Sequence, residues 1–298
     1  MTCSTISQNN VGLIGVGTMG RHMLERLQGA GYTVAAYDPV PAAREYIREK
    51  GAVLLDDAGA VARQAEVIIF SLPMPKHVLE TIDAMQESLT PNHVLVDTST
   101  VSPETTRTSA ARAAQKGAGY VDAPILGRPS AAGNWLMPSG GSEADIERVK
   151  PYLRTFARDA VRVGESGAGN AFKLLNQLMF SVINAVSAEV MALTDVLGIE
   201  RKVFYDVISQ SGAATVSGLF KETAVRAVDD RFDEPNFTME LLCKDAGLGI
   251  QMAKDAGVCP LVASFVQSIN ENAKGVGLAK QDTSALVKLF RTYYSSLE

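Results

Sequence analysis

The chain has 298 residues, with 28 lysines and arginines against 33 aspartates and glutamates, and therefore a formal net charge of −5. A hydrophobic fraction of 46% and a charged fraction of 20% are typical of a globular protein with a sizeable core and exclude a disordered or collagen-like chain. The length predicts two domains or one large one. The mild acidity argues against nucleic acid as the main partner, because phosphate binding needs a basic surface.

Cysteine usage and the N-terminal residues favour a cytoplasmic protein without metal. Cys3, Cys243 and Cys259 are scattered and form no CxxC or His/Cys cluster, so neither a zinc site nor a disulfide framework is expected. The first ten residues are polar and lack an apolar signal core, which argues against export. The longest charge-free apolar stretch, residues 174–188, also contains several polar residues. It is too short and too polar to cross a bilayer and is expected to form a buried helix.

The first half of the chain alternates short apolar runs with helical patterns. Residues 18–28 show helical spacing, with apolar side chains on one face. Runs of strand length occupy residues 11–14, 32–37, 67–72, 94–97, 120–122 and 161–163. Near-continuous apolar strands separated by helices predict a parallel sheet covered on both faces.

The pattern changes at residues 164–170 (GESGAGN). Beyond this segment no run alternates as a strand does, and the apolar spacing is helical. The expected helices occupy residues 172–197, 203–208, 239–256, 261–274 and 284–297. We therefore expect two domains, an α/β domain over residues 1–165 and an all-helical domain over residues 166–298.

The segment VGLIGVGTMG carries Gly15, Gly17 and Gly20 in GxGxxG spacing, with a strand before it and a helix after it. In a dinucleotide-binding (Rossmann) domain the first glycine permits the tight turn. The second lets the backbone approach a pyrophosphate, and the third lets the helix pack close to the sheet. The N-terminus of the helix then presents N–H groups to phosphate. An ordinary glycine-rich turn is the alternative.

Asp38 ends the second expected strand, 18 residues beyond Gly20. A carboxylate there can bond the ribose hydroxyls and repels a 2′-phosphate, which favours NAD over NADP. The alternative is a turn-forming aspartate before Pro39. Arg44, six residues further on, could still meet a 2′-phosphate, so NADP stays open.

At this point the chain resembles the β-hydroxyacid dehydrogenases, which include 3-hydroxyisobutyrate dehydrogenase and tartronate semialdehyde reductase. The resemblance covers about residues 11–294 and rests on six ordered motifs: GLIGVGTMG, SLP, VDTST, DAP, GAGNAFKLLNQ and KD. It implies a Rossmann domain and a helical domain joined by a long helix, with the active site in the cleft between them. It also implies a homodimer or homotetramer, assembled through the helical domain.

The resemblance carries residue roles with it. Lys173 would be the catalytic lysine, with Asn176 and Gln177 one turn on. The family usually has asparagine where Gln177 stands, but tartronate semialdehyde reductases look similar in having the Asn-Gln pair. The positions that would bind the cofactor are Gly15, Val16, Gly17, Thr18, Met19, Gly20, Asp38, Leu72, Pro73, Thr100 and Lys244.

Lys173 also stands out from the residues themselves. It lies in the first turn of an apolar helix, where the positive end of the helix dipole disfavours a cation. The dipole and partial burial both favour a neutral amine, as a general acid/base needs near neutral pH. Asn176 and Gln177 would share its helix face. A lysine that extends its ammonium to solvent at a helix end is the alternative.

The segment after DAP departs from the family. Where the family usually reads Val-Ser-Gly-Gly and holds the substrate carboxylate, this chain has Ile125, Leu126, Gly127 and Arg128. We expect residues 126–128 to contact substrate, with the Arg128 guanidinium taking over the anion. The alternative is that Arg128 points into solvent. The sole tryptophan, Trp135, is expected in the same loop as a packing residue.

The sequence therefore predicts hydride transfer between a nicotinamide cofactor and a small 3-hydroxy acid, or its semialdehyde or keto form, with Lys173 as general acid/base. An imine reductase of the same fold is one alternative, although those enzymes generally lack the lysine. A non-catalytic nucleotide-binding module is another. His22, His77 and His93 are dispersed and are interpreted as surface or helix-end residues.

Overall fold

The computed structural model describes residues 9–211 and 217–295, so Cys3 lies outside the described residues. Two compact units divide the chain between Lys173 and Leu174. This division falls inside helix α7 (Ala168–Val196), whereas the boundary expected at residue 165 precedes that helix. The first turns of α7 belong to the first unit, and the rest of the helix belongs to the second.

The first unit is built on one eight-stranded sheet with the strand order β3-β2-β1-β4-β5-β6-β7-β8. Neighbouring strands pair in parallel, except that β6 and β7 are antiparallel. The α/β prediction for this part of the chain is confirmed. The strands are β1 (Asn10–Ile14), β2 (Thr33–Tyr37), β3 (Val53–Leu54), β4 (Val67–Phe70), β5 (Val94–Asp97), β6 (Gly119–Asp122), β7 (Trp135–Gly140) and β8 (Ala157–Gly164).

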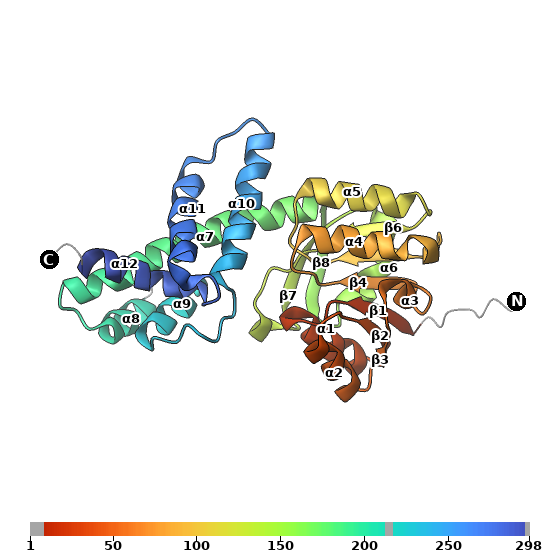
Figure 1. The fold of residues 1–298 in the computed structure, drawn as a ribbon, viewed down its shortest axis with the longest axis horizontal. Helices are drawn as coiled ribbons and strands as arrows, with labels where there is room; N and C mark the ends of the chain where they lie inside the picture. The colour runs from red at the N-terminus through yellow and green to blue at the C-terminus, as the bar shows by residue number, and fades with distance from the viewer. Residues whose placement is uncertain (1–8, 212–216, 296–298) are drawn as a thin grey trace, which may run out of the picture. The chain divides into compact units, whose positions relative to one another are not determined.

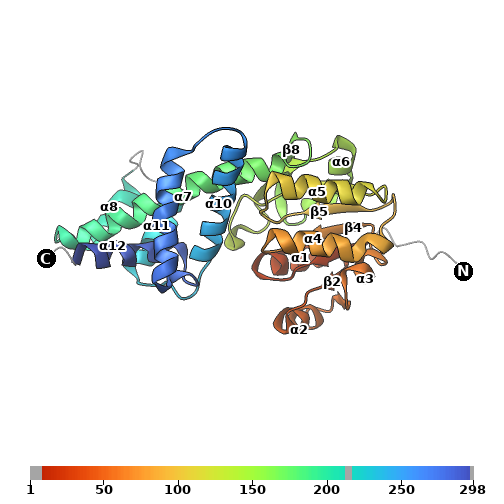
Figure 2. The same cartoon turned by 45° about the horizontal axis from the view of Figure 1, so that its top comes forward.

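Helices cover both faces of this sheet. Successive side chains of each central strand point alternately into the two helix layers. In β4, Val67 and Ile69 pack with α1, α2 and α6, whereas Ile68 and Phe70 pack with α3, α4 and α5. Both ribbon views show α4 and α5 side by side (Figures 1 and 2). The helices are α1 (Thr18–Gly29), α2 (Pro41–Glu49), α3 (Ala58–Ala62), α4 (Pro75–Met85), η1 (Gln86–Ser88), α5 (Pro103–Ala114), η2 (Pro129–Ala131) and α6 (Glu143–Leu153).

Two strands, β3 and β7, were not expected from the sequence. β7 contains Pro138 and Gly140, which are uncommon inside strands, and it pairs antiparallel with β6. Trp135 is its first residue rather than part of a loop. The strand expected over residues 67–72 ends at Phe70, because the amide of Leu72 donates to the Ser99 hydroxyl at 2.9 Å instead of continuing the ladder.

His93 is also misassigned by the sequence pattern, because it is buried in the turn before β5. Its Nδ1 accepts a hydrogen bond from the Thr90 amide at 2.9 Å. Its Nε2 lies 2.8 Å from the carbonyl oxygen of Ala62, which requires the proton on Nε2. The ring thus joins α3 to this turn as a structural residue.

The second unit is helical, as the sequence predicts. Apart from one isolated β-bridge between Thr238 and Asp282, its regular elements within the described residues are helices. They are α7, α8 (Arg201–Gln210), α9 (Gly218–Val228), α10 (Met239–Asp255), α11 (Leu261–Ala273), the single turns η3 (Lys274–Leu278) and η4 (Thr283–Ala285), and α12 (Leu286–Ser295). The ribbons of α10 and α11 run side by side (Figures 1 and 2).

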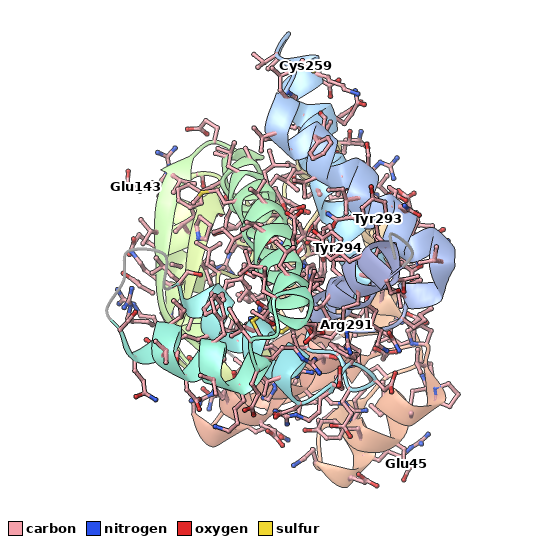
Figure 3. All side chains as sticks on the ribbon, turned by 90° about the vertical axis from the view of Figure 1, so that its left-hand side faces the viewer. Glu45, Glu143, Cys259, Arg291, Tyr293 and Tyr294 are labelled. Atoms are coloured by element: carbon pink, nitrogen blue, oxygen red, sulfur yellow. The ribbon has the colours of Figure 1, made fainter. Side chains whose placement is uncertain are left out.

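The last helix is held to α7 by polar contacts from its C-terminal half. The Tyr294 hydroxyl donates to Glu189 at 3.2 Å, and the Arg291 guanidinium lies 3.1 Å from Asp195. Figure 3 labels Arg291 and Tyr294 on α12, and Cys259 at the turn between α10 and α11. Cys259 is exposed and Cys243 is buried.

Helix α7 is only partly buried within the chain, although residues 174–188 were expected to form a buried helix. Leu174 and Met191 are fully buried, but Leu175, Met179 and Val186 are each more than half exposed. The helix has the length and apolarity of a membrane span, which core helices of globular proteins also have. One face packs in the unit's core, and the opposite face presents an apolar stripe.

Candidate functional site

The loops that follow four neighbouring strands meet at one edge of the sheet, because β1, β4, β5 and β6 are parallel neighbours. These loops begin at Gly15, Ser71, Thr98 and Ala123. The chain leaves β1 towards β2 on one side, and β4 lies on the other. The strand order therefore reverses at β1, and ligands of open α/β sheets bind in the crevice at such a point.

The glycine loop has the geometry that a dinucleotide requires. Gly15 has a φ of +91°, and a Cβ there would lie 2.3 Å from the Ser71 carbonyl oxygen. A Cβ on Gly20 would lie 2.0 Å from the Gly15 carbonyl oxygen, so the glycine lets α1 pack against the loop. Gly17, by contrast, has nothing within 4 Å of its Cβ position, and no side chain caps α1 there. The open space and uncapped helix end fit a pyrophosphate.

The other predicted residues of this loop differ in exposure. Thr18 is exposed, whereas Met19 is half-buried and packs against the core. The Val16 side chain is fully buried in that core, so Val16 can contact other groups at the loop only through its backbone. Its amide donates to Asp38 Oδ2 at 2.7 Å.

Asp38 is buried at the end of β2 and holds two segments of backbone. Besides Val16, it accepts the Val40 amide at its Oδ1, at 2.8 Å. These charge-assisted bonds join the glycine loop to the turn after β2. Arg44, the possible phosphate partner, lies 3.0 Å from Asp56 and donates to the Leu55 carbonyl at 3.3 Å.

The loops after β4 and β5 are bonded to each other. The Ser99 hydroxyl accepts the Leu72 amide, and the Thr98 hydroxyl donates to the Phe70 carbonyl at 2.6 Å. Asp97 is fully buried, and its Oδ1 accepts the Ser99 amide at 2.9 Å. Leu72 and Thr100 are half-buried, whereas Pro73 is exposed. These three predicted cofactor-binding residues therefore lie on two loops of one sheet edge that are hydrogen-bonded to each other.

The beginning of α7 is fixed to this same edge by Asp122 and Asn170. Asp122, the last residue of β6, accepts the amides of Gly167 and Asn170, each at 2.8 Å. The Asn170 side chain accepts the Val101 amide at 3.1 Å and donates to the Thr106 hydroxyl at 3.1 Å. Asp122 thus satisfies the helix N-terminus from another element, as a capping residue does.

Glycines allow this close approach. A Cβ on Gly169 would lie 2.5 Å from the Asp122 carbonyl oxygen and 2.6 Å from that of Pro138. The first turn of α7 therefore packs directly on the backbone of β6 and β7. Burial raises the pKa of Asp122 to about 6, although its bonds from Gly167 and Asn170 oppose that shift.

Lys173 lies on α7 one turn beyond Asn170 and is half-buried. The structure assigns it to the unit that contains the sheet. Asn176 and Gln177 follow on the same helix in the second unit. The turn that carries the predicted catalytic lysine is therefore continuous with a helix start that two buried side chains hold in place.

Within the second unit, the predicted residues Gln177 and Lys244 both contact Asp245, and Asn176 contacts Gln177. The buried Gln177 donates to Asp245 Oδ2 at 2.7 Å, and the Lys244 ammonium lies 2.8 Å from Asp245 Oδ1. Asn176 donates to Gln177 Oε1 at 3.3 Å. Asp245 is buried and joins the Gln177 amide on α7 to the Lys244 ammonium on α10, a link that the sequence does not show.

The loop of residues 126–133 is packed against Trp135. Leu126 pairs with Leu136 through two backbone hydrogen bonds, of 2.8 and 3.2 Å. Gly127 is exposed, and a Cβ there would lie 2.3 Å from Trp135 Cδ1. Arg128 is half-buried. Trp135 itself is fully buried, in agreement with a packing role.

Asp122, Asn170 and Asp245 received no role from the sequence. Each belongs to one of the six family motifs, but its function depends on contacts with distant segments. A carboxylate on the last residue of a buried strand was the one available signal for Asp122. Among residues 9–211 and 217–295 no group of His, Cys, Asp and Glu side chains could hold a metal ion.

Comparison with known proteins agrees with this geometry. Residues 10–164 match the NAD-binding domain of 6-phosphogluconate dehydrogenase. Residues 167–290 match a domain described as the NAD-binding domain of NADP-dependent 3-hydroxyisobutyrate dehydrogenase. The chain is similar to 2-(hydroxymethyl)glutarate dehydrogenase of Eubacterium barkeri, with 31% identity over 94% of each chain.

Two further relatives support the same conclusion. The 3-sulfolactaldehyde reductase of Escherichia coli is 29% identical over 94% of this chain and 95% of that protein. The structure of 3-hydroxyisobutyrate dehydrogenase from Salmonella typhimurium matches with a TM-score of 0.87 and 28% identity. It covers 94% of this chain and 99% of that one. The chain belongs to the β-hydroxyacid dehydrogenase family and is an NAD(P)-dependent oxidoreductase acting on CH–OH groups.

Proposed function

We propose that this enzyme interconverts a small 3-hydroxy acid and its semialdehyde or keto form, with Lys173 as the general acid/base. The anchoring of the start of α7 by Asp122 and Asn170 carries the proposal. It fixes the helix one turn before a lysine, at the sheet edge that also bears the glycine loop. The names of the relatives support the substrate class, since they denote small acids with a hydroxyl or an aldehyde group.

Lys173 moves one proton in each direction of the reaction. In oxidation its neutral amine accepts the proton of the substrate hydroxyl, and in reduction its ammonium donates a proton to the developing alkoxide. A bound nicotinamide supplies the hydride acceptor or donor. Asn176 and Gln177, three and four residues on, share the helix face of Lys173 and orient the substrate. Lys244 contributes to the cofactor site from α10.

A substrate screen tests the reaction class. Purified protein is assayed with short hydroxy acids and semialdehydes and with both nicotinamide cofactors, and we expect turnover of at least one 3-hydroxy acid. Turnover restricted to cyclic imines would instead favour an imine reductase. Tight cofactor binding without turnover of either class would favour a non-catalytic nucleotide-binding module.

For the cofactor, we expect catalytic efficiency with NAD to exceed that with NADP by at least about tenfold. The Asp38 carboxylate at the end of β2 repels a 2′-phosphate, and Arg44 is engaged by Asp56 and Leu55. Asp38→Asn keeps the size of the side chain but removes its charge. It should lower the ratio of catalytic efficiency with NAD to that with NADP. A wild-type preference for NADP would overturn the role of Asp38.

The glycine loop offers a matched pair of variants. Gly17→Ala places a methyl group in open space, so the free energy of unfolding should stay unchanged. The dissociation constant for NADH should rise about tenfold or more, because the methyl group occupies the pyrophosphate position. Gly20→Ala clashes with the Gly15 carbonyl and should lower stability as well. Unchanged NADH binding by Gly17→Ala would contradict the phosphate assignment.

We propose that residues 126–128 line the substrate site and that Arg128 binds the substrate anion. Arg128→Ala should raise the KM for the substrate about tenfold or more, because a charge-assisted hydrogen bond is lost, and should leave the KM for NAD unchanged. Arg154→Ala is the control, since Arg154 is an exposed arginine paired with Asp159. An unchanged substrate KM would remove Arg128 from the site.

We further propose that the enzyme acts in the cytoplasm as a homodimer or homotetramer. The exposed thiol of Cys259 suits a reducing compartment. The apolar stripe on α7, with Leu175, Met179 and Val186 exposed in the single chain, suits burial against another copy. Light scattering coupled to size-exclusion chromatography measures the assembly directly.

A further inference from the structure

We propose that Trp135 is a positioning residue for substrate recognition: its indole N–H fixes the backbone from which Arg128 extends. This inference rests on the anion-binding role proposed for Arg128. Nε1 of Trp135 donates to the Arg128 carbonyl oxygen at 2.7 Å. The amide of Ala131 donates to the same oxygen at 2.9 Å. One carbonyl thus joins the turn η2 to the first side chain of β7.

The indole also contacts Gly127, the residue that precedes Arg128. Gly127 packs so closely on the ring that a Cβ would lie 2.3 Å from Cδ1, and its φ is +152°. Leu126, the residue before Gly127, forms backbone hydrogen bonds with Leu136, the residue after Trp135. The residue before Arg128 must therefore be glycine, because any β-carbon at this position would clash with the indole.

Trp135 can hold this backbone in place because its own ring is packed in the core. It is fully buried, with the Phe156 ring edge-on at 6.2 Å and the His22 ring edge-on at 6.3 Å. A buried indole N–H without its acceptor would be costly, so the ring and the Arg128 carbonyl stabilise each other's position.

The C-terminal end of the loop of residues 126–133 is held by separate hydrogen bonds. The Arg26 guanidinium donates to the Ala132 carbonyl at 2.5 Å, and the Gly133 amide donates to the Phe156 carbonyl at 2.8 Å. Loss of the indole bond therefore loosens Arg128 locally rather than releasing the whole loop. A preorganised guanidinium loses less conformational entropy when it binds an anion, so the effect should appear in substrate binding.

The test compares Trp135→Phe, Arg128→Ala and the double variant. The probe is whichever of 2-(hydroxymethyl)glutarate, 3-hydroxyisobutyrate and 3-sulfolactaldehyde the wild type turns over with the lowest KM. Trp135→Phe keeps a ring in the core but removes the donor, and should raise that KM about three- to tenfold, with kcat and the KM for the cofactor unchanged. In the Arg128→Ala background the same change should add less than about twofold, because the residue it positions is gone.

Phe156→Leu is the matched control, since it disturbs the packing of the same indole without removing a hydrogen bond. It should lower thermal stability but leave the KM unchanged. If Trp135→Phe does not fold, the tryptophan can be replaced biosynthetically by benzothienylalanine, which has the same ring shape but sulfur in place of N–H. The chain has one tryptophan, so only residue 135 changes, and the same rise in KM is expected.

The outcomes separate the two proposals. A raised KM in Arg128→Ala together with an unchanged KM in Trp135→Phe or the benzothienyl protein overturns the role of Trp135 alone. That role is also overturned if the two changes are fully additive, or if Phe156→Leu raises the KM as much. An unchanged KM in Arg128→Ala overturns the anion-binding role itself, and the positioning role with it.

Discussion

If Lys173 is the general acid/base, its replacement by alanine should lower kcat about a thousandfold in both directions, because residues 168–176 carry no other ionisable side chain. NADH binding, followed by fluorescence, should change less than about threefold, since the glycine loop and Asp38 are untouched. Lys254→Ala, near the end of α10, is the control and should retain wild-type activity.

Lys173→Arg separates proton transfer from charge. A guanidinium keeps the positive charge but does not release its proton at accessible pH. It should therefore be as inactive in oxidation as the alanine variant. If either variant kept most of the wild-type rate, Lys173 would not be the proton donor, and the proposed mechanism would fail.

Replacement of Asp122 by alanine should lower the free energy of unfolding by about 3 kcal/mol, the largest stability effect we expect from one side chain. It leaves two buried amide groups at the start of α7 without acceptors, and each unsatisfied group costs about 1–3 kcal/mol. Urea unfolding measures the change. Asp83→Ala, which removes an exposed pair with Arg112, should cost less than about 1 kcal/mol.

The cost of Asp122→Ala should also depend on pH in a defined direction. Burial raises the pKa of Asp122 to about 6 in the folded protein, compared with about 3.9 when unfolded. Between those values the folded state binds more protons, so this group's contribution to stability falls as pH rises and is lowest above pH 6. The difference between wild type and Asp122→Ala should therefore be larger at pH 5 than at pH 7. A difference that grew with pH would contradict the raised pKa.

Several elements could be predicted because their cause is local. The GxGxxG motif, the strand before it and the helix after it depend on residues close in sequence. The structure explains each glycine, because a Cβ on Gly15 or Gly20 would clash with backbone and Gly17 faces open space. Apolar runs predicted six strands, and helical spacing predicted most of the second unit. The family resemblance added the order of motifs and, with it, Lys173.

Elements determined by distant partners were missed or misplaced. The residues of β7 do not have a strand-like composition. They form a strand because they pair with β8 and β6, so Trp135 lies in the sheet and not in the expected loop. His93 is buried because α3 offers the Ala62 carbonyl, 31 residues earlier. The exposed face of α7 and its buried face have the same apolar character in sequence, so composition alone could not distinguish them.

The sequence by itself therefore determined the class of the fold and the glycine loop, since the order of apolar runs and the local glycine spacing specify them. The role of Lys173 stays a prediction that the family resemblance supplied. The tertiary structure alone decided how those residues are held: Asp122 against the start of α7, Asp245 between Gln177 and Lys244, and the Trp135 indole on the Arg128 carbonyl. These contacts join segments up to 68 residues apart. A hydrogen bond forms wherever folding brings donor and acceptor together, and no local pattern specifies which distant partner that will be.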